Sequence, residues 1–546
     1  MITKPFKMKT KLPLFLTLFL ACFISVISNA QAPTLGSAAN FVVFSANGAV
    51  TANVANSLNT HLTGNVGTNT SGGTSTGFGN VNGNMQDNNI VSQLAAADLL
   101  IAYNQLNALV PNFFPASLLG NGASLSPGVY FINGEAVLNG NLTLNGQGDP
   151  NALFVLQIQG AFSSNALSEV ILTNGTKACN VFWKIEGLVD MATGTKMKGT
   201  VIANNAAIMM DVNSTLEGRL LSTTGAVTVN GIDAKLPLGC GSPVLTGPIA
   251  PDLGTTVCYA LFSGIDSVIN SGITNVTGDI GTNTGLTTGF NSANVTGTIH
   301  PAPNTSTADC AADLLEVRDY LNALTHDIEL LYPAQFGNDL LLTPHTYLMN
   351  GSTVLTNNLF LDAQNNSDAV FVIKIYGAFS TTTNAKVMLV NGALAKNVYW
   401  IVNGAIAIGN SSEMKGTFVA NNGAVNISTG TIVEGRVMTT NGALTTFSVT
   451  VNMTSGCETL STETIGKSKN AMTVYPNPFS NSLTIQVNEN TLNSEFRLYD
   501  MLGKLLIQKN ITQNTSVIEV NVLPGMYIYS FMNDAGTVQT GKLLAK

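Results

Sequence analysis

The chain has few charged residues. Asp, Glu, Lys and Arg make up only 10% of its 546 residues, whereas about a quarter is usual in globular proteins. Its 31 acidic and 23 basic residues give a formal net charge of −8. An acidic chain of this kind argues against nucleic acid and against anionic membrane surfaces as partners.

Long apolar runs are equally rare, and the one that stands out covers residues 12–27. Lysines precede this run, and the small residues SNAQA follow it, which indicates a signal peptide over 1–32. No other stretch is long and apolar enough to cross a membrane. We therefore expect a secreted protein.

What the chain does contain is one long segment that occurs twice. TGNVGTNT at 63–70 returns as TGDIGTNT at 277–284, and KGTVIANN at 198–205 returns as KGTFVANN at 415–422. A unit of roughly 205 residues is large enough for a core of its own. We expect two domains of one fold at 33–240 and 253–457, joined by a linker at 241–252.

A shorter period inside each unit predicts the fold. Gly377, Gly404, Gly423 and Gly442 each open a Gly-Ala-apolar step, at spacings of 27, 19 and 19 residues, and positions 160, 187, 206 and 225 repeat these spacings. Periods near 20 residues are typical of solenoids, and short β-branched runs between Asn-Gly turns indicate strands. The sequence therefore predicts a mainly β protein with two tandem right-handed parallel β-helices of triangular cross-section.

One segment in each unit, 90–109 and 307–324, breaks this pattern. Neither segment contains Gly or Pro, and apolar residues recur in them at helical spacing, among them Leu94, Leu100 and Ile101. We expect a long α-helix beside each β-helix, with this apolar face packed on the strands that begin NVFW and NVYW.

Alternation along the Gly-Ala-apolar strands assigns their side chains to two sides. Phe379, Ile406, Val425 and Leu444 are the recurring large apolar residues, and we predict that they face inward. Their neighbours then form a flat, uncharged outer surface, and these are the candidate binding residues. In the second domain they are Ser380, Thr382, Ala405, Ala407, Ala424, Asn426, Ser428, Ala443 and Thr445, and in the first domain Ser163, Ala207, Ala226, Thr228 and Asn230.

A flat, regular and uncharged surface suits a flat, regular partner, and ice is such a partner. Stacked coils lie about 4.7–4.9 Å apart, which is close to the spacing of oxygens in the ice lattice. Methyl groups order nearby water, and hydroxyls and amides bind it. Because Met209, Asp190 and Asp211 interrupt the surface of the first domain, we expect the second domain to bind ice more strongly.

Both units resemble the ice-binding family often called DUF3494. The resemblance is carried by Leu-Gly and Phe-Ser at 35–36 and 44–45, by TGNVGT and TGDIGT, by the Ala-Ala-x-Asp-Leu segments, and by GAFS, NVFW and NVYW. It implies a discontinuous right-handed β-helix with an adjacent long helix. It also implies adsorption to ice through one flat face.

The composition changes after Cys457, where a linker at 458–472 leads to a compact segment at 473–546. Its alternating apolar and polar residues predict a small β-sandwich. The YPNP sequence at 475–478, YDMLG at 499–503 and LPGMY at 523–527 resemble the type A sorting domain of the type IX secretion system of Bacteroidota. The resemblance implies the secretion machinery as a partner, and either release or surface attachment.

Few residues are suited to chemistry. Cys179 and Cys240 form a natural pair in the first domain, and Cys258 and Cys310 could join in the second, although the connectivity stays open. No two cysteines have the spacing of metal ligands, so we expect no metal and no cofactor.

Two other classes of function, an enzyme and an adhesin, fit the sequence less well. The four histidines do not recur between the units, and no acidic pair recurs on the flat surface, so we do not expect an enzyme. A secreted adhesin or surface-layer module is the better alternative. Binding to a glycan would call for exposed aromatic residues, whereas the only tryptophans, Trp183 and Trp400, are expected beneath the helices. We expect a monomer.

Overall fold

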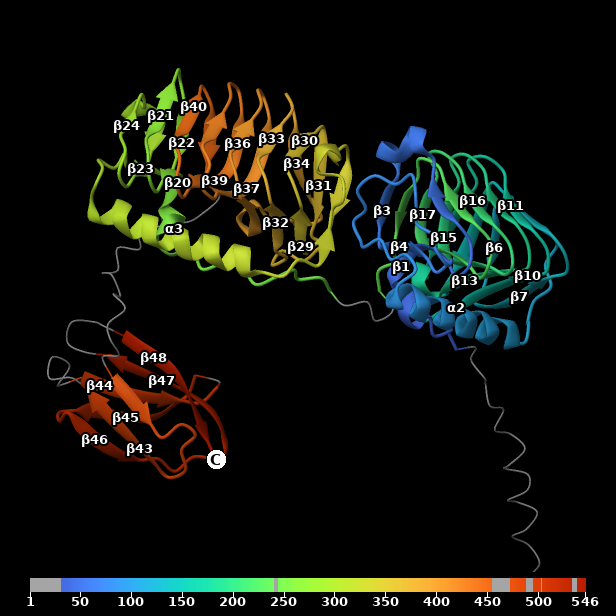
Figure 1. Cartoon of the computed structure of the whole chain (residues 1–546). Coiled ribbons are helices and arrows are strands. Elements are labelled where there is room, and N and C mark those ends of the chain that lie inside the picture. The colour runs from blue at the N-terminus through green and yellow to red at the C-terminus, as the bar shows by residue number, and fades with distance from the viewer. Residues whose placement is uncertain (1–30, 240–243, 454–471, 488–493, 502, 533–537) are drawn as a thin grey trace, which may run out of the picture. The chain divides into compact units, whose positions relative to one another are not determined.

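The computed structural model describes residues 31–239, 244–453, 472–487, 494–501, 503–532 and 538–546 (Figure 1). The chain divides into two compact units, numbered 1–457 and 458–546, and both repeats lie in the first. Each repeat folds as a parallel β-helix beside one long α-helix, which confirms the predicted architecture. Of the signal peptide predicted over 1–32, residues 1–30 lie outside the described residues.

The first β-helix has three sides made from two sheets. The seven-stranded sheet follows the order β2 (Val50–Ala52), β18 (Val227–Val229), β16 (Ile208–Met210), β14 (Val189–Met191), β11 (Phe162–Ser164), β8 (Ala136–Asn139) and β5 (Leu118–Gly120). The twelve-stranded sheet contains β1 (Phe41–Ser45), β3 (His61–Thr63), β4 (Asn65–Thr68), β6 (Ala123–Leu125), β7 (Gly128–Ile132), β9 (Asn141–Asn145), β10 (Phe154–Ile158), β12 (Glu169–Thr173), β13 (Val181–Ile185), β15 (Lys196–Ala203), β17 (Thr215–Ser222) and β19 (Asp233–Lys235). Because β15 pairs with both β12 and β13, this sheet continues around a corner and forms two sides.

The second β-helix repeats this plan. Its eight-stranded sheet follows the order β24 (Thr287–Thr288), β21 (Val268–Ser271), β40 (Leu444–Phe447), β38 (Val425–Ile427), β36 (Ile406–Ile408), β33 (Phe379–Thr381), β30 (Thr353–Thr356) and β27 (Phe336–Gly337). Its fourteen-stranded sheet contains β20 (Tyr259–Ser263), β22 (Asn275–Thr277), β23 (Asp279–Thr282), β25 (Val295–Thr296), β26 (Ile328–Glu329), β28 (Leu340–Leu342), β29 (Thr346–Met349), β31 (Asn358–Asp362), β32 (Phe371–Ile375), β34 (Lys386–Val390), β35 (Val398–Val402), β37 (Glu413–Ala420), β39 (Ile432–Thr439) and β41 (Thr450–Asn452).

Both β-helices are discontinuous. The first strands of each repeat pair with its last strands, as β2 does with β18 and β21 does with β40. The chain then forms a cap and leaves the stack through helix α2 (Ile90–Ala108) or α3 (Thr305–Ala323). From the other end it winds back, coil by coil, to the strands where it began.

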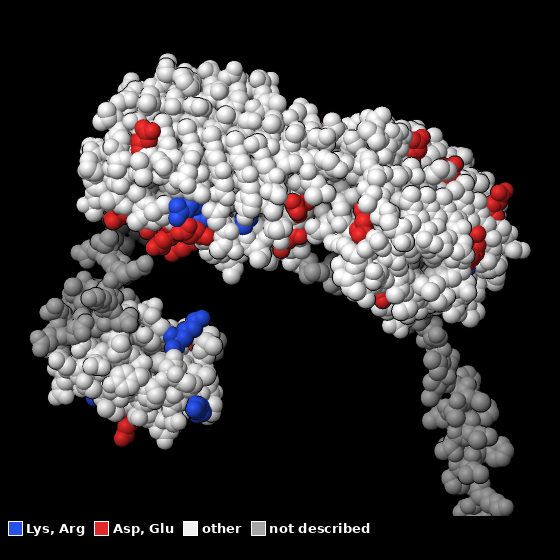
Figure 2. All heavy atoms as spheres, in the orientation of Figure 1, with Lys and Arg blue, Asp and Glu red and all other residues white. Residues whose placement is uncertain are grey.

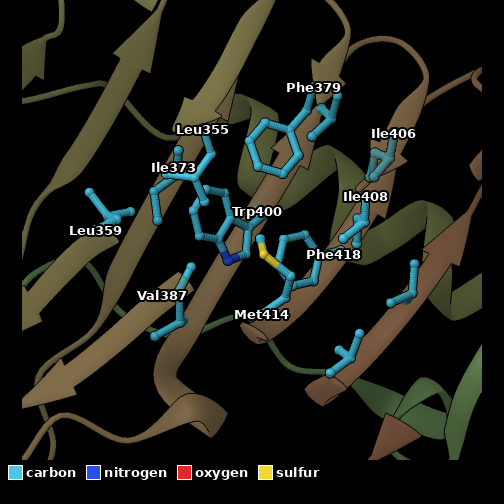
Figure 3. Close-up of a cluster of buried hydrophobic side chains, with 14 of the residues drawn as sticks. Leu355, Leu359, Ile373, Phe379, Val387, Trp400, Ile406, Ile408, Met414 and Phe418 are labelled. Atoms are coloured by element: carbon cyan, nitrogen blue, oxygen red, sulfur yellow. The ribbon is translucent and has the colours of Figure 1, made fainter. Parts of the chain in front are cut away.

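Inward-facing side chains fill the centre of each β-helix. In the second, Trp400 is fully buried and stacks on Phe379 and Phe418, at ring-centroid distances of 5.4 and 5.1 Å (Figure 3). The four predicted inward residues, Phe379, Ile406, Val425 and Leu444, are all buried completely. Alternation along the strands therefore assigned the two sides of this sheet correctly.

The helix α2 packs through a face that the sequence did not reveal. Its buried side consists of Ser92, Ala95, Leu99, Ala102 and Leu106. The predicted contact residues Leu94, Leu100 and Ile101 are 50–54% exposed, so that assignment was wrong. Helix α2 has apolar residues on two faces and only one charged residue, and therefore no polar pattern marks its solvent side. The small side chains of Ala95 and Ala102 allow it to approach the sheet closely.

The disulfide expected between Cys258 and Cys310 does not form. Cys310 is a buried free thiol that faces the sheet from α3 and packs among Tyr259 and Leu314. Cys258 and Cys179 are both disulfide-bonded. Cys240, the expected partner of Cys179, lies outside the described residues.

The C-terminal unit consists of two antiparallel sheets around one apolar core that includes Phe479, Phe496 and Phe531. One sheet contains β42 (Met472–Tyr475), β43 (Ser482–Val487) and β46 (Thr515–Glu519). The other contains β45 (Leu505–Ile511), β44 (Ser494–Tyr499), β47 (Gly525–Met532) and β48 (Val538–Ala545). This arrangement confirms the predicted β-sandwich.

One buried side chain closes the end of each long helix. Lys374 on β32 donates from Nζ to the carbonyl oxygens of Asn322 and Leu324 at the end of α3. At the matching position Gln157 donates from Nε2 to Leu106 O and Leu109 O, at 2.8 and 3.0 Å. Both donors bond to carbonyls in the last turn of the helix, where the intrahelical hydrogen bonds run out.

We expect Lys374→Met to lower the free energy of unfolding of the second β-helix by about 1–3 kcal/mol, because it leaves these acceptors unpaired. Lys374→Gln should restore most of this loss, since glutamine does the same work in the first β-helix. Urea unfolding of the whole chain measures both changes. Lys415→Met, which breaks a surface ion pair, should cost less than about 1 kcal/mol, and a loss equal to that of Lys374→Met would contradict the helix-closing role.

Candidate functional site

The eight-stranded sheet of the second β-helix presents its outward side chains in straight rows. The centre row runs through Thr288, Ile269, Thr445, Asn426, Ala407, Ser380 and Val354, which stand opposite one another in consecutive parallel strands. The leading row, two residues earlier in each coil, contains Ser267, Ala443, Ala424, Ala405 and Ala378. Ladder hydrogen bonds from the inward residues that follow hold this row in line. We call these rows the flat face of the second β-helix.

All nine residues predicted for this surface lie on its outward side. Thr382, Ala405, Ala407, Ala424 and Asn426 are exposed, and Ser380, Ser428, Ala443 and Thr445 are partly exposed. None of the nine carries a charge. The structure thus brings the predicted residues together on one surface, with methyls concentrated in the leading row.

The flat face extends beyond the predicted residues. Ile269 and Thr288 lengthen the centre row at one end, and Val354 lengthens it at the other. Phe447, which is 42% exposed, stands beside Ser271 at the same end as Ile269. The sequence period did not reveal Ile269, because its coil precedes the helix in the chain and joins the stack only through the pairing of β21 with β40.

The polar side chains of this centre row are not used inside the protein. Within the described residues, Thr445, Asn426 and Ser380 have no side-chain hydrogen bond to another protein group. Their hydroxyl and amide groups are therefore free to bind water. Because the strands hold these groups in register, the positions at which they can bind water recur at regular intervals.

The corresponding sheet of the first β-helix has a different surface. Its centre row runs through Thr51, Thr228, Met209, Asp190, Ser163, Val137 and Leu118. The five predicted residues of this surface, Ser163, Ala207, Ala226, Thr228 and Asn230, are all partly exposed. However, Asp190 and Met209 are exposed in the centre of the row.

Two of these predicted polar residues are engaged within the protein. The Thr228 hydroxyl lies 3.2 Å from that of Thr51. Asn230 accepts a hydrogen bond from Asn56 and donates one to Asp211, each at 2.8 Å. Hydrogen bonds from the Thr193 side chain, the Val212 amide and Asn230 lower the pKa of Asp211 below its ordinary value, so its charge persists at neutral pH. The first β-helix thus engages Thr228 and Asn230 within the protein, whereas the counterpart of Thr228 in the second, Thr445, is free.

Charged residues gather on another side of each β-helix, where they pair between coils. Lys198 contacts Glu217 at 2.9 Å, and Lys415 contacts Glu434 at 2.7 Å. The visible surface over β40, β36, β33 and β30 carries no Lys, Arg, Asp or Glu (Figure 2). The lack of charge is thus a property of one face and not of the whole molecule.

Close contact between coils explains the small residues beside the flat face. A Cβ atom added at Gly423 would overlap the carbonyl oxygen of Gly404 in the neighbouring coil. The turn therefore requires glycine, and the coils stay close enough for the rows to remain straight. Gly423 and Gly404 are structural residues and not candidate contacts.

Neither a metal centre nor a membrane helix is found in the described parts of the chain. No group of three or more His, Cys, Asp or Glu side chains is arranged to hold a metal ion there. The helices in those parts are too short or too polar to cross a membrane.

Solved and curated relatives share this architecture. A crystal structure of an ice-binding protein from an Antarctic bacterium, Flavobacteriaceae, is 58% identical, with a TM-score of 0.76, and the match covers 78% of this chain and 100% of that one. The ice-binding protein of Nostoc sp. (strain HG1) is 36% identical over 257 residues, which are 46% of this chain and 92% of that protein.

Family models match nearly all of the described chain. The model for the secretion system C-terminal sorting domain matches residues 473–546. The Ice-binding-like model matches residues 46–234 and 263–452, one match for each β-helix. Since these two segments together span well over half of its length, the chain belongs to the Ice-binding-like family.

Proposed function

We propose that this protein adsorbs to ice through the flat face of its second β-helix and thereby inhibits ice growth and recrystallisation. The observation that carries the proposal is the centre row, in which uncharged side chains stand in register across seven strands and keep their polar groups free. Membership of the Ice-binding-like family supports it. Relatives named as ice-binding proteins support it as well.

The mechanism requires two kinds of group in alternation. Methyl groups of the leading row, from Ala405, Ala424 and Ala443, cannot bind water, so the adjacent water forms ordered cages. Hydroxyls and amides of the centre row hold part of that water by hydrogen bonds. Bound water with the period of the strands then joins the crystal surface, and the attached protein blocks further growth at that point.

The first β-helix contributes less on this proposal. Asp190 keeps its own hydration shell, and Met209 projects from the row, where the second β-helix has Ala407 and Asn426. Leu188, which is 40% exposed, takes the place that Ala405 holds in the leading row. Each change disturbs regular water, so this face binds ice more weakly or on a different crystal plane.

The sorting domain places the protein outside the cell or on its surface, where it would meet ice. We infer that its partners are the ice crystal and the secretion machinery, that it acts as a monomer, and that it has no enzymatic activity. The free and uncharged flat face supports a binding role, since catalysis needs convergent acid, base or nucleophilic groups.

We expect the double variant Asn426→Tyr and Thr445→Tyr to lose most of the thermal hysteresis and recrystallisation inhibition of the whole chain, because two rings would hold ice away from the rows. Both positions face solvent, so the unfolding midpoint should stay close to that of the parent. Ile432→Tyr, on another side of a neighbouring coil, is the matched control and should keep full activity.

An inactive parent would refute the ice proposal and favour the adhesin alternative. An active double variant would instead show that the ice-binding surface lies elsewhere on the molecule. If Ile432→Tyr also loses activity, the tyrosines act by disturbing the fold and not by blocking the flat face.

Exchanging residues between the two faces tests whether the second face binds ice more strongly than the first. Ala407→Asp should weaken ice binding by the second β-helix, because a carboxylate enters the centre row. The converse pair, Asp190→Ala and Met209→Asn, should strengthen binding by the first β-helix. Both changes can be measured as the binding of fluorescently labelled protein to single ice crystals. For the first β-helix, the double variant Asn426→Tyr and Thr445→Tyr is combined with the exchange, so that the second face does not bind. Equal binding by the two unmodified faces would contradict the proposed inequality.

A further inference from the structure

The two β-helices meet end to end through a polar contact, which we call the joint. On the first β-helix it is formed by Asn80, Asn82 and Asn84, which alternate along one edge coil. Asn80 pairs with the backbone of Tyr332 in both directions, each hydrogen bond being 2.9 Å long. Asn82 donates to the Thr343 hydroxyl at 3.1 Å and accepts from the Tyr347 hydroxyl at 2.8 Å, and Asn84 donates to Asp327 O at 3.0 Å.

His61, on the strand β3, adds a different kind of bond to this contact. Its Nδ1 lies 2.8 Å from a carboxylate oxygen of Asp233, and its Nε2 lies 2.9 Å from the backbone oxygen of Asn338 in the second β-helix. A carboxylate and a carbonyl oxygen can only accept. Both bonds therefore form together only when both ring nitrogens carry a proton, which is the imidazolium form. A neutral ring must give up one of them.

The charges around His61 favour this form. Burial alone would lower its pKa, but the hydrogen bonds to Asp233 and Asn338 and the charges of Asp233 and Asp339 raise the pKa of His61 above its ordinary value. The strand that carries Asp233 also carries one cation, the exposed Lys235. At the other end of the joint, burial lowers the pKa of His345.

We propose that His61 is a pH-dependent latch that holds the two β-helices in one fixed orientation. In the joined state the ring is bonded from both sides, so docking is favoured at a pH below the ordinary value for histidine. That contribution is lost as the pH rises through the raised pKa of the joined state. Above it, the neutral ring donates to only one of Asp233 and Asn338 O, so the cross-joint bond of His61 is weaker, whereas the asparagine contacts remain.

The other end of the second β-helix lacks this device. The positions that match His61 and Asp233 are Asn275 and Thr450, which pair in the same way between β22 and β41. Asn82 and Asn84 are matched by Thr296 and Thr298, in NVTGT instead of NVNGN. Asn80 keeps its counterpart in Asn294, but the groups that match His61, Asp233, Asn82 and Asn84 are all replaced at that end.

The consequence for ice rests on the proposed function. Two faces held in one orientation bind a single crystal as one unit, so the second attachment follows the first at a high effective concentration. Loosening the joint would let the faces attach independently. His61 is then a positioning residue, because it touches neither face.

Hydrogen exchange of the whole chain tests the latch directly. The backbone N–H of Tyr332 donates to Asn80 across the joint, so its protection reports opening of the joint. Corrected for intrinsic rates, protection of Tyr332 should be measurably lower at pH 8.5 than at pH 5.5, because the raised pKa of His61 makes the joined state more stable at the lower pH. In His61→Gln, protection should be lower and the same at both values.

His300→Gln is the matched control, because His300 also lies 2.9 Å from a carboxylate, that of Asp279, but away from the joint. It should behave as the parent does. Asp233→Asn, which keeps the shape but removes the charge, should move the loss of protection to lower pH. The amide of Val425, bonded within the second β-helix, reports whether each variant is folded.

Equal Tyr332 protection in the parent at both pH values would overturn the latch, as would an unchanged pH response in His61→Gln. Thermal hysteresis of the same samples separates the two proposals. A chain whose joint responds to pH but which leaves ice unaffected would refute the ice-binding proposal and leave the latch intact.

Discussion

The in-register stacking of parallel coils is the constraint on which the rest of the structure depends. Each coil hydrogen-bonds to the next at a fixed spacing, so any outward position becomes a row across the sheet. The turns must stay narrow to preserve this, and Gly423 and Gly404 show how little room there is between neighbouring backbones. A flat face is thus a product of the fold, and the residue types in its rows decide what the face can bind.

The two β-helices show how residue type changes that outcome on one scaffold. In the first, Asn56, Asn230, Asp211 and Thr193 form a hydrogen-bonded series across successive coils, which stabilises the sheet but leaves little capacity for water. In the second, the positions that match Asn230 and Asp211 hold Phe447 and Ser428, so this series cannot form. Polar groups that bond to one another strengthen the protein, whereas polar groups left free can bind the solvent.

Much of this could be predicted from the sequence, because the fold is periodic. The 19-residue spacing gave the coils, and alternation then placed Ile406, Val425 and Leu444 inward and their neighbours outward. The period could not place Ile269, because only the discontinuous topology brings β21 beside β40. The family resemblance implies that topology, whereas the 19-residue period covers only the coils that follow the helix.

Other errors have local causes. In α2 the apolar residues cover two faces, so spacing alone could not identify the buried one, and Leu94 and Ile101 are exposed instead. The predicted pairing of Cys310 with Cys258 rests only on the fact that neither cysteine has a counterpart in the first repeat. The Cys310 thiol faces the apolar layer beneath α3. Neither outcome is encoded in a period, because each depends on which neighbour packs against the residue.

The ends of a solenoid pose a problem that its middle does not. A terminal coil has an edge with unpaired backbone and no neighbour to cover it, and solenoids usually need a cap there. Here the two domains use each other: Asn80 binds the backbone of Tyr332 as a strand would, and His61 reaches the carbonyl of Asn338. The bonds that these residues form across the contact are all polar. The contact can also respond to pH, which an apolar cap of the same size could not do.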